Sequence, residues 1–369
     1  MFLRKIVITG GPCAGKTTAM SWIQNALIRR GYRVIFIPET ATELISGGVA
    51  PWTCSSNLEY QKCQVELQLQ KERIFEQGVR TMPVDKVLLI CDRGVMDNRA
   101  YMNDEEWAAV LSSLHTNEID LRDGYDAVFH LVTAAKGAVE AYTLSNNAAR
   151  IETIEQASHI DDKLIAAWTG HPHFRIIDNS GDFSGKLRNL VAEILSFLGE
   201  PDPYKTERKF LIRYPDLGRL EQLPNCTKVE IFQTYLISRD DTQIRIRQRG
   251  TNGHYIFTRS EKRQLTPLRR VDVERRLTQE EYMSQLMEAD PTAHPIKKTS
   301  YCLVDHDQYY EIDVYPEWKK QAILEIEVPE DQKEIRFPED ITIIREVSGD
   351  KRYKNYALAH EMISEDKEE

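Results

Sequence analysis

Residues 10–17 combine the residue types that bind phosphate. They fit the pattern G-x-x-x-x-G-K-[ST], directly after an apolar strand-like run and directly before a helix-like stretch. Glycines let backbone N–H groups face phosphate oxygens, and a helix N-terminus adds positive potential. We predict that this loop binds ATP or GTP, with Lys16 on the outer phosphates and Mg²⁺ on the Thr17 hydroxyl. The predicted nucleotide-binding residues of the loop are Gly10, Gly11, Pro12, Cys13, Ala14, Gly15, Lys16, Thr17 and Thr18.

Two further strand-like runs end in acidic residues. Glu39 follows Val34–Ile37, where an open α/β sheet binds its ligands. We expect it to serve as a base or hydrogen-bond partner for a phosphate acceptor, or else as a helix cap or an indirect partner of magnesium. Asp92 ends the apolar run 87–91, an arrangement typical of a carboxylate that holds Mg²⁺. Arg93 is expected to contact the acceptor or a phosphate, or to pair with a neighbouring acid.

Three more residues complete the predicted nucleotide site. Residues 136–168 lie where nucleoside and nucleotide kinases carry a mobile lid, and Arg150 is the arginine of that segment. A lid arginine neutralises charge on a transferring phosphoryl group, although an ordinary solvated arginine fits equally. Asp178 and Asn179 follow Phe174–Ile177, where such folds contact the base. The catalytic candidates are Lys16, Glu39, Asp92, Arg93 and Arg150.

The second half of the chain alternates charged and apolar residues at period two. Five runs share this pattern, which predicts an antiparallel sheet or barrel with one charged face. Because unpaired buried charges are costly, we expect a barrel around a wet, charged tunnel rather than solvated outer faces. The candidate phosphate-binding cations are Lys209, Arg245, Arg247, Arg270 and Lys298. The candidate ligands for Mg²⁺ or Mn²⁺ are Glu207, Asp272, Glu274, Asp313, Glu325 and Glu327.

These residues need two different scaffolds. The first half alternates apolar strand-like runs with helical stretches, which predicts an α/β domain with a parallel sheet. The strand-like runs are Lys5–Thr9, Val34–Ile37, Val87–Cys91, Ala127–Val132 and Phe174–Ile177; the helical stretches are Thr17–Arg30, Asn57–Val79 and Lys186–Phe197. Pro201 and Pro203 interrupt the chain and favour an extended connection. We therefore expect a P-loop domain over 1–200, a linker over 201–204, a second domain over 205–360 and a frayed tail over 361–369.

Motifs of the second half resemble the CYTH, or triphosphate tunnel metalloenzyme, superfamily. They follow the superfamily's order from Glu207-x-Lys209 through Arg245-x-Arg247 to Glu325-x-Glu327. The resemblance implies an α+β antiparallel barrel that binds a triphosphate with divalent metal. Lys205 and Ser300 stand where the superfamily has an acid and an arginine, so one metal ligand and one phosphate contact are missing.

The first half resembles the TRPL translocation-defect proteins, which pair the same two domains in the same order. The motifs that carry this resemblance are Thr9-Gly-Gly-Pro-Cys13, Pro38-Glu-Thr-Ala-Thr42, Cys91-Asp-Arg-Gly-Val-Met-Asp97 and Trp168-x-Gly-His-Pro172. The resemblance implies GTP binding, phosphoinositide binding and a role in membrane-protein trafficking.

Three classes of function follow. The first is an enzyme whose P-loop domain hydrolyses ATP or GTP or phosphorylates a small acceptor, and whose tunnel binds polyphosphate or an organic triphosphate. Alternatively, the tunnel domain is itself a triphosphatase and the P-loop domain regulates it. The second is a binding switch. The third, a nucleic-acid partner, is disfavoured because the net charge is -10.

No run approaches the ~20 apolar residues of a membrane span, and the six cysteines lack metal spacing, so we expect a cytoplasmic protein with reduced thiols. The oligomeric state is open.

Overall fold

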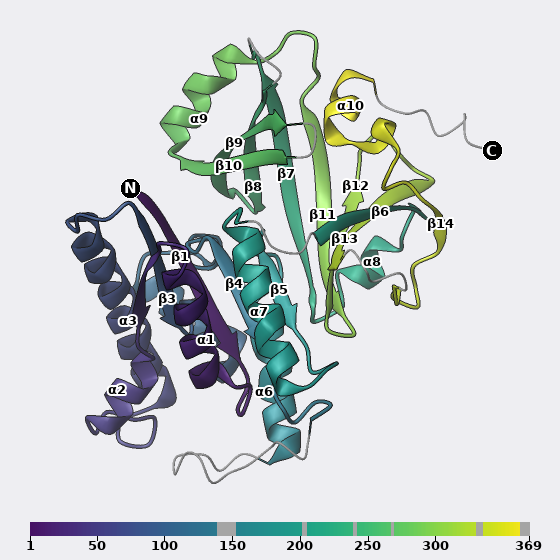
Figure 1. The fold of residues 1–369 in the computed structure, drawn as a ribbon. Coiled ribbons are helices and arrows are strands. Elements are labelled where there is room, and N and C mark those ends of the chain that lie inside the picture. The colour runs from purple at the N-terminus through teal and green to yellow at the C-terminus, as the bar shows by residue number, and fades with distance from the viewer. Residues whose placement is uncertain (139–152, 201–204, 239–241, 267–268, 330–334, 362–369) are drawn as a thin grey trace. The chain divides into compact units, whose positions relative to one another are not determined.

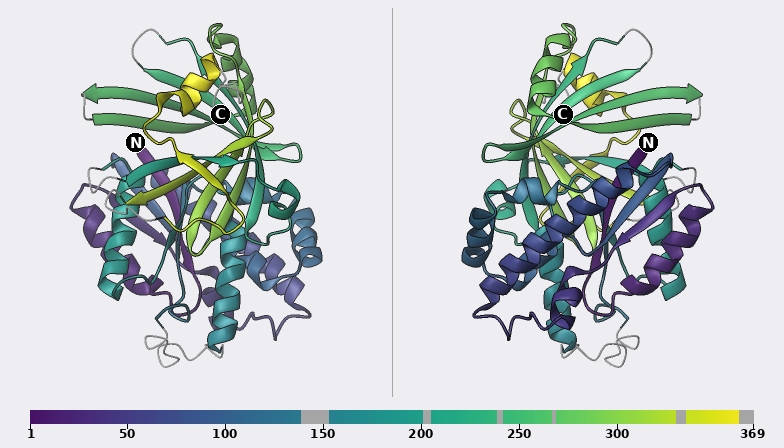
Figure 2. Two further views of the ribbon diagram at one scale, coloured as in Figure 1. Left: turned by 90° about the vertical axis from the view of Figure 1, so that its right-hand side faces the viewer. Right: turned by 90° about the vertical axis from the view of Figure 1, so that its left-hand side faces the viewer.

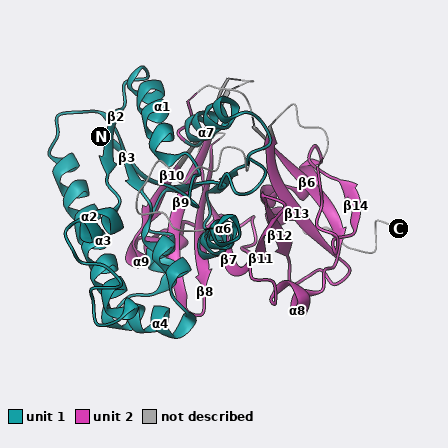
Figure 3. Cartoon of the chain, turned by 90° about the horizontal axis from the view of Figure 1, so that it is seen from below, with its two compact units in different colours: residues 1–197 teal, residues 198–369 magenta. Residues whose placement is uncertain are grey.

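The structure is a computed structural model of the chain. It describes residues 1–138, 153–200, 205–238, 242–266, 269–329 and 335–361. Of residues 205, 206, 263–266, 269–273 and 329 it describes the backbone alone. The chain divides into two compact units, residues 1–197 and 198–369, which Figure 3 colours separately.

A parallel five-stranded sheet forms the centre of the first unit (Figure 1). The strand order is β2-β3-β1-β4-β5, and every neighbouring pair is parallel. The strands are β1 (Phe2–Gly10), β2 (Arg33–Ile37), β3 (Lys86–Asp92), β4 (Ala127–Leu131) and β5 (Phe174–Ile177). The centres of β1, β3 and β4 are buried on both faces, as a sheet covered by helices requires. The predicted α/β domain with a parallel sheet is confirmed.

Helices cover both faces of this sheet. They are α1 (Lys16–Ile28), α2 (Thr40–Ser46), α3 (Asn57–Arg80), η1 (Val95–Tyr101), α4 (Asp104–Ser113), α5 (Glu118–Arg122), α6 (Ile154–Trp168) and α7 (Phe183–Phe197). Helix α1 packs against α7 on one face, and α3 packs against β2 and β3 on the other (Figures 1 and 3). Because each strand runs in the same direction, the loops after β1, β2 and β3 meet at one edge of the sheet.

The predicted lid differs from the structure in its second half. Residues 154–168 form α6, which starts at a capping box between Thr153 and Gln156 and packs against η1 and β1. Its buried face includes Asp161, Leu164 and Trp168, so this part of the segment is a core helix and not a lid. Arg150 lies outside the described residues.

A nine-stranded antiparallel sheet forms the second unit. Its order is β10-β9-β8-β7-β11-β12-β13-β6-β14. The strands are β6 (Lys205–Arg213), β7 (Cys226–Leu236), β8 (Gln243–Thr251), β9 (His254–Thr266), β10 (Arg269–Leu277), β11 (Ile296–Asp305), β12 (Gln308–Val314), β13 (Gln321–Pro329) and β14 (Ile343–Glu346). The antiparallel sheet matches the sequence prediction. A closed barrel is not shown, because no pairing among the described residues joins β10 to β14.

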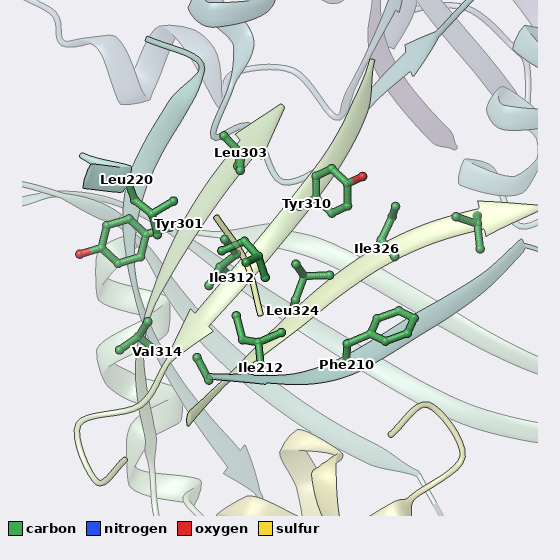
Figure 4. Packing of buried hydrophobic residues seen from close by; sticks show 13 residues of the cluster. Phe210, Ile212, Leu220, Tyr301, Leu303, Tyr310, Ile312, Val314, Leu324 and Ile326 are labelled. Carbon is green, nitrogen blue, oxygen red and sulfur yellow. The ribbon is translucent and has the colours of Figure 1, made fainter. Parts of the chain in front are cut away.

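Short helices and an apolar core lie against this sheet. The helices are α8 (Leu217–Leu220), α9 (Gln279–Gln285), η3 (Leu286–Glu288), η4 (Lys351–Tyr353) and α10 (Asn355–His360). The strands fan out in both views of Figure 2, as expected of a twisted antiparallel sheet. One apolar cluster contains Phe210, Ile212, Tyr301, Ile312 and Leu324, which Figure 4 shows in close contact across β6, β11, β12 and β13. These residues alternate with the charged residues of the same strands, so the apolar residues form one face of the sheet.

Two further findings concern the whole described chain. Among the residues that the structure describes, no helix is both long and apolar enough to cross a membrane. All six cysteines are free thiols.

Candidate functional site

The phosphate loop joins the end of β1 to the start of α1. The N-cap residue of α1 is Gly15, with φ 91°, and it offers no side-chain cap to the first helical N–H groups. A Cβ at Gly15 would lie 2.5 Å from the Phe183 ring, so only glycine combines this backbone conformation with this close contact. The first turn of α1 carries no acidic residue, and Thr17 and Thr18 are exposed there. The uncapped N–H groups therefore suit an anion.

Lys16 lies folded over its own loop. Its Nζ donates to the backbone oxygen of Gly10 at 3.0 Å. Burial, followed by repulsion from Arg93, lowers the pKa of Lys16 to about 8, although Asp92 and Glu39 oppose the shift. The nearby carboxylates thus balance only part of the positive charge of Lys16 and Arg93, and the negative charge of a polyphosphate would balance the rest.

Glu39 and Arg93 form an ion pair between the ends of β2 and β3. The Thr42 hydroxyl donates to the other carboxylate oxygen of Glu39 at 2.7 Å. Burial opposes ionisation of Glu39, but Arg93 and Lys16 outweigh it and lower the pKa to about 2. Glu39 is therefore a carboxylate at neutral pH, held by one arginine and one hydroxyl.

Arg93 has a backbone conformation that is unusual for a residue with a side chain. Its φ is 70°, in the left-handed region. Two hydrogen bonds fix the residue there: its N–H donates to Ile8 O at 3.1 Å, and Gln68 Nε2 donates to Arg93 O at 3.3 Å. Arg93 Nη1 lies 3.6 Å from Asp97 Oδ2. Strain that surrounding contacts hold in place is typical of functional sites.

Asp92 is the acid best suited to magnesium. Burial raises its pKa, and Lys16 opposes the shift. Its Oδ1 is buried and has no hydrogen-bond partner in the described part of the chain. No group of three or more His, Cys, Asp or Glu residues arranged for a metal occurs among the described residues. Mg²⁺ on a phosphate loop needs no such group, because water and phosphate oxygens supply most of its ligands. Asp92 and Thr17 fit this kind of site.

The sequence gives no direct signal for Asp161, which ties the phosphate loop to α6. Its carboxylate accepts from Gly11 N at 2.9 Å, Thr133 N at 3.2 Å and Lys136 Nζ at 3.0 Å, and it contacts His130 Nε2 at 3.0 Å. A Cβ at Gly11 would approach Asp161 Oδ1 to 2.7 Å. Burial opposes ionisation of Asp161, but His130 and Lys136 lower its pKa below the usual range. The Thr133 hydroxyl also donates to the oxygen of Pro12, so two contacts fix the start of the loop.

Asp97 is a second residue that sequence reasoning missed. Its carboxylate accepts from the Thr9 hydroxyl at 2.7 Å and from Trp168 Nε1 at 2.6 Å. Asp97 is 2% exposed. The same carboxylate faces Arg93, so it joins β1, α6 and η1 beside the Arg93–Glu39 pair. The pattern Asp-Arg-x-x-x-Asp, with one acid at the end of β3 and the other in η1, was the available signal.

The predicted base contacts have other partners in the structure. Asn179 Nδ2 donates to Thr133 O at 2.8 Å and to Lys136 O at 2.6 Å, and Asn179 Oδ1 accepts from Lys186 at 2.8 Å. Its amide therefore holds the loop after β4. Asp178 accepts from the Ser180 hydroxyl at 2.7 Å. In this region the Phe183 ring packs on Gly15 of the phosphate loop and is 48% exposed.

The other predicted loop residues are backbone elements of the turn. Ala14 N donates to Gly11 O at 3.3 Å, and Cys13 has φ 57°. Cys13 is partly exposed and Ala14 is buried. The structure thus brings Lys16, Glu39, Asp92 and Arg93 together at the loop.

In the second unit, strand register places the predicted charged residues on one face of the sheet. Cross-strand partners include Glu274 with Ser260, Ser260 with Arg245, and Arg247 with Gln233. Further along, Ser300 pairs with Asp313, Glu311 with Glu325, Glu325 with Lys209, and Glu327 with Glu207. Directly opposite residues share a face, and so do residues two apart on a strand. Arg270 and Asp272 lie on β10, where their backbones pair with β9. Their side chains lie outside what the structure describes.

The cations on this face differ in their partners. Lys209 Nζ lies 2.5 Å from Glu325 and 2.9 Å from Glu207. Lys298 is 5% exposed and pairs with Asp313, which also accepts from the Ser300 hydroxyl. Glu274 accepts from the Ser260 hydroxyl at 2.8 Å, and Glu327 is exposed.

Arg245 and Arg247 instead share a neutral partner. Arg245 Nη1 and Arg247 Nη2 donate to the same oxygen of Gln233, at 3.3 Å and 3.2 Å. Burial, followed by repulsion from Arg245, lowers the pKa of Arg247. Two cations thus converge on one neutral amide oxygen.

Comparisons with known proteins find similar solved structures and a match to a family model. A comparison with solved structures finds crystal structures titled inorganic triphosphatase NE1496 and hypothetical protein NE1496, each 26% identical. They cover 44% and 42% of this chain and 97% and 98% of their own, with TM-scores of 0.32 and 0.31. No curated protein matches the chain. Residues 5–186 match the family model described as an AAA domain, and this stretch is therefore similar to P-loop nucleoside triphosphatases.

Proposed function

We propose that the first unit binds ATP or GTP with Mg²⁺ at residues 10–18 and either hydrolyses it or transfers its terminal phosphoryl group to a small acceptor. One observation carries the proposal. Lys16, Glu39, Asp92 and Arg93 converge where β1, β2 and β3 end, beside the uncapped N-terminus of α1. The match of residues 5–186 to an AAA domain supports nucleotide binding.

Each residue has a distinct role in the proposal. Lys16 and the N–H groups of the loop bind the outer phosphates, and Thr17 and Asp92 hold the metal. Mg²⁺ supplies charge neutralisation between the outer phosphates. Catalysis is then mainly positioning and electrostatic stabilisation by residues that are already in place.

Glu39 and Arg93 are placed to orient the molecule that accepts the phosphoryl group. An ionised carboxylate beside the phosphate loop can accept a hydrogen bond from a hydroxyl group, and Arg93 fixes the orientation of this carboxylate. Arg150 remains a candidate for neutralising charge on the transferred phosphoryl group. Hydrolysis and transfer to a small molecule use the same groups.

For the second unit we propose a site for a phosphorylated ligand on the charged face of the nine-stranded sheet. The order of its motifs, similar to that of the CYTH superfamily, supports a triphosphate, a polyphosphate or a phosphorylated head group as the ligand. In the alternative function, similar to that of the TRPL translocation-defect proteins, the protein is a switch that binds GTP and phosphoinositide without turnover. A third possibility is a tunnel triphosphatase that the first unit regulates.

A binding and turnover panel tests these functions. Purified full-length chain is mixed with ATP, GTP, tripolyphosphate and thiamine triphosphate, each with Mg²⁺ or Mn²⁺. We expect ATP or GTP to be turned over, and Lys16→Ala to abolish both binding and turnover, whereas Lys163→Ala on the exposed side of α6 changes neither. Binding without turnover supports the switch. Full nucleotide affinity in Lys16→Ala contradicts the assignment of the loop.

A further inference from the structure

The charged face of the nine-stranded sheet contains two kinds of cation. On β6 and β11, Lys209 and Lys298 are each in contact with carboxylates. On β8, Arg245 and Arg247 have no carboxylate within ion-pair distance in the described residues. The two lysines therefore form ion pairs within the protein, whereas Arg247 experiences the carboxylates of Glu274 and Glu311 only at longer range.

The arginine pair has donors left over. Both guanidinium groups donate to Gln233 Oε1, and Gln233 Nε2 in turn donates to the Tyr235 hydroxyl at 3.1 Å. The Nε atoms of Arg245 and Arg247 are buried and have no hydrogen-bond partner among the described residues. Gln233 is 1% exposed, so water does not reach the amide that the two arginines share. Two positive charges around a neutral amide are costly unless an anion completes the site.

Phosphate matches these donors in charge and geometry. A guanidinium group presents paired N–H donors that fit two phosphate oxygens, and buried charge-assisted hydrogen bonds are stronger than neutral ones. A phosphoryl group with two negative charges would balance both arginines.

Three of the carboxylates predicted to bind a divalent metal already have partners within the protein. Glu325 and Glu207 already bind Lys209, while Asp313 binds both Lys298 and Ser300. A metal ion there would have to displace two ammonium groups from three carboxylates, and each displaced ammonium would lose its partner. Among the described residues no cluster of His, Cys, Asp or Glu is arranged to hold a metal. Three of the six predicted metal ligands, Glu207, Asp313 and Glu325, thus bind the lysines.

We propose that Arg245 and Arg247 bind the phosphoryl groups of a ligand directly and that this binding needs no divalent metal. The inference deepens the function proposed for the second unit, and it separates this site from the metal-dependent site of the first unit. The source of the phosphoryl groups is either a soluble polyphosphate or the phosphomonoester head group of a lipid.

Titration calorimetry with tripolyphosphate tests the proposal. Full-length chain carrying Lys16→Ala is used, so that the phosphate loop of the first unit does not contribute. We expect the dissociation constant to change less than about threefold between EDTA and Mg²⁺ or Mn²⁺. We expect Arg245→Gln and Arg247→Gln each to weaken binding at least tenfold, in line with the loss of a charge-assisted hydrogen bond. Arg259→Gln is the matched control, because Arg259 lies opposite Ile246 on the other face and pairs with Glu261.

Two carboxylate variants separate this proposal from a metal site. Asp313→Asn and Glu325→Gln release Lys298 and Lys209, so we expect unchanged or tighter tripolyphosphate binding. A metal-dependent site predicts that both variants, and EDTA, abolish binding. Loss of tripolyphosphate binding in the two carboxylate variants overturns the proposal, and so does loss of binding in EDTA. Wild-type affinity in the double variant Arg245→Gln with Arg247→Gln overturns it as well. Circular dichroism melts identify any variant that fails to fold, in which case Arg245→Lys and Arg247→Lys replace it; we expect these to bind more weakly because they lack the paired donors.

Vesicles distinguish the two sources of phosphate. Phosphatidylcholine vesicles with and without phosphatidic acid are tested for capture of the same protein, with tripolyphosphate as competitor. Capture that requires phosphatidic acid, Arg245 and Arg247 identifies a lipid head group. Tripolyphosphate binding without capture identifies a soluble ligand, and absence of both overturns the proposal. Nucleotide binding by the chain with intact Lys16 is measured separately, so failure here leaves the function of the first unit untouched.

Discussion

The guanidinium group of Arg93 forms an ion pair with the carboxylate of Glu39 and so joins the end of β3 to the end of β2. The pair keeps Glu39 ionised, with a pKa of about 2, next to the loop that carries Lys16. A carboxylate fixed in this way can orient a hydroxyl acceptor during phosphoryl transfer.

Replacement of Glu39 tests this role. Glu39→Gln removes the charge but keeps the shape, so we expect nucleotide affinity to change little and turnover to fall about 10²-fold or more. Glu43→Gln is the control, since Glu43 is exposed on α2 and pairs with Lys71 at 2.8 Å. Initial rates with the active nucleotide provide the measurement. Turnover equal to that of the control would remove Glu39 from the reaction.

Lys16 predicts an unusual pH dependence of nucleotide binding. Its pKa in the free protein is about 8, and a bound polyphosphate raises it toward the ordinary value because an anion favours the ammonium form. Binding is therefore undiminished below about pH 8 and weakens as the pH rises through 8, with one proton taken up per bound nucleotide in that range. Calorimetry in two buffers of different ionisation enthalpy measures this uptake. Lys16→Arg should remove the dependence, and a flat affinity up to pH 10 in the wild type would contradict the argument.

Asp161 should affect the loop without touching the nucleotide. Asp161→Asn weakens the contact with Gly11 N and leaves fewer acceptors for four neighbouring groups, so we expect nucleotide affinity to fall about tenfold and the free energy of unfolding to fall by about 1–3 kcal/mol. Asp162→Asn is the neighbour control, because Asp162 is exposed and forms an ion pair with Lys136 at the protein surface. Calorimetry and thermal melts report the two effects separately. A loss of stability with unchanged nucleotide affinity would show that Asp161 supports the core and not the loop.

Phe183 provides a flat apolar surface beside the phosphate loop. Its ring packs on Gly15 and is half exposed, so a nucleotide base can stack on it. Stacking contributes about 1–3 kcal/mol per base, so we expect Phe183→Ala to weaken ATP or GTP binding about 5- to 150-fold. Phe183→Tyr keeps the ring and should retain the affinity. Equal loss in both variants would argue against stacking.

Much of the first unit could be predicted from its sequence because local signals were strong. The apolar runs at β1 and β3 and the pattern from Gly10 to Thr17 identify strands and a phosphate loop without any tertiary information. Helix α6 was missed although its capping box is visible in the sequence, because the expectation of a lid overrode the cap at Thr153.

The remaining site residues depend on contacts that no local pattern contains. Asp161 reaches Gly11 across 150 positions of the chain, and Asp97 reaches Trp168 across 71. In the second unit, alternation predicts that Lys209 and Glu325 lie on the charged face, but only the register of β6 against β13 makes them partners. The sequence alone was thus enough to predict a charged face, but not to predict which of its residues form ion pairs with each other.

The alternation in β8 also affects how this protein can diverge. Arg245 and Arg247 face the charged side, while Ile244 and Ile246 belong to the apolar cluster on the other side. Substitutions at the two arginines can therefore alter ligand preference without repacking the interior. Deletion of a single residue within β8 would instead send the isoleucines to the ligand and the arginines into the core. We expect natural variation in this strand to consist of exchanged residues, with insertions and deletions confined to its ends.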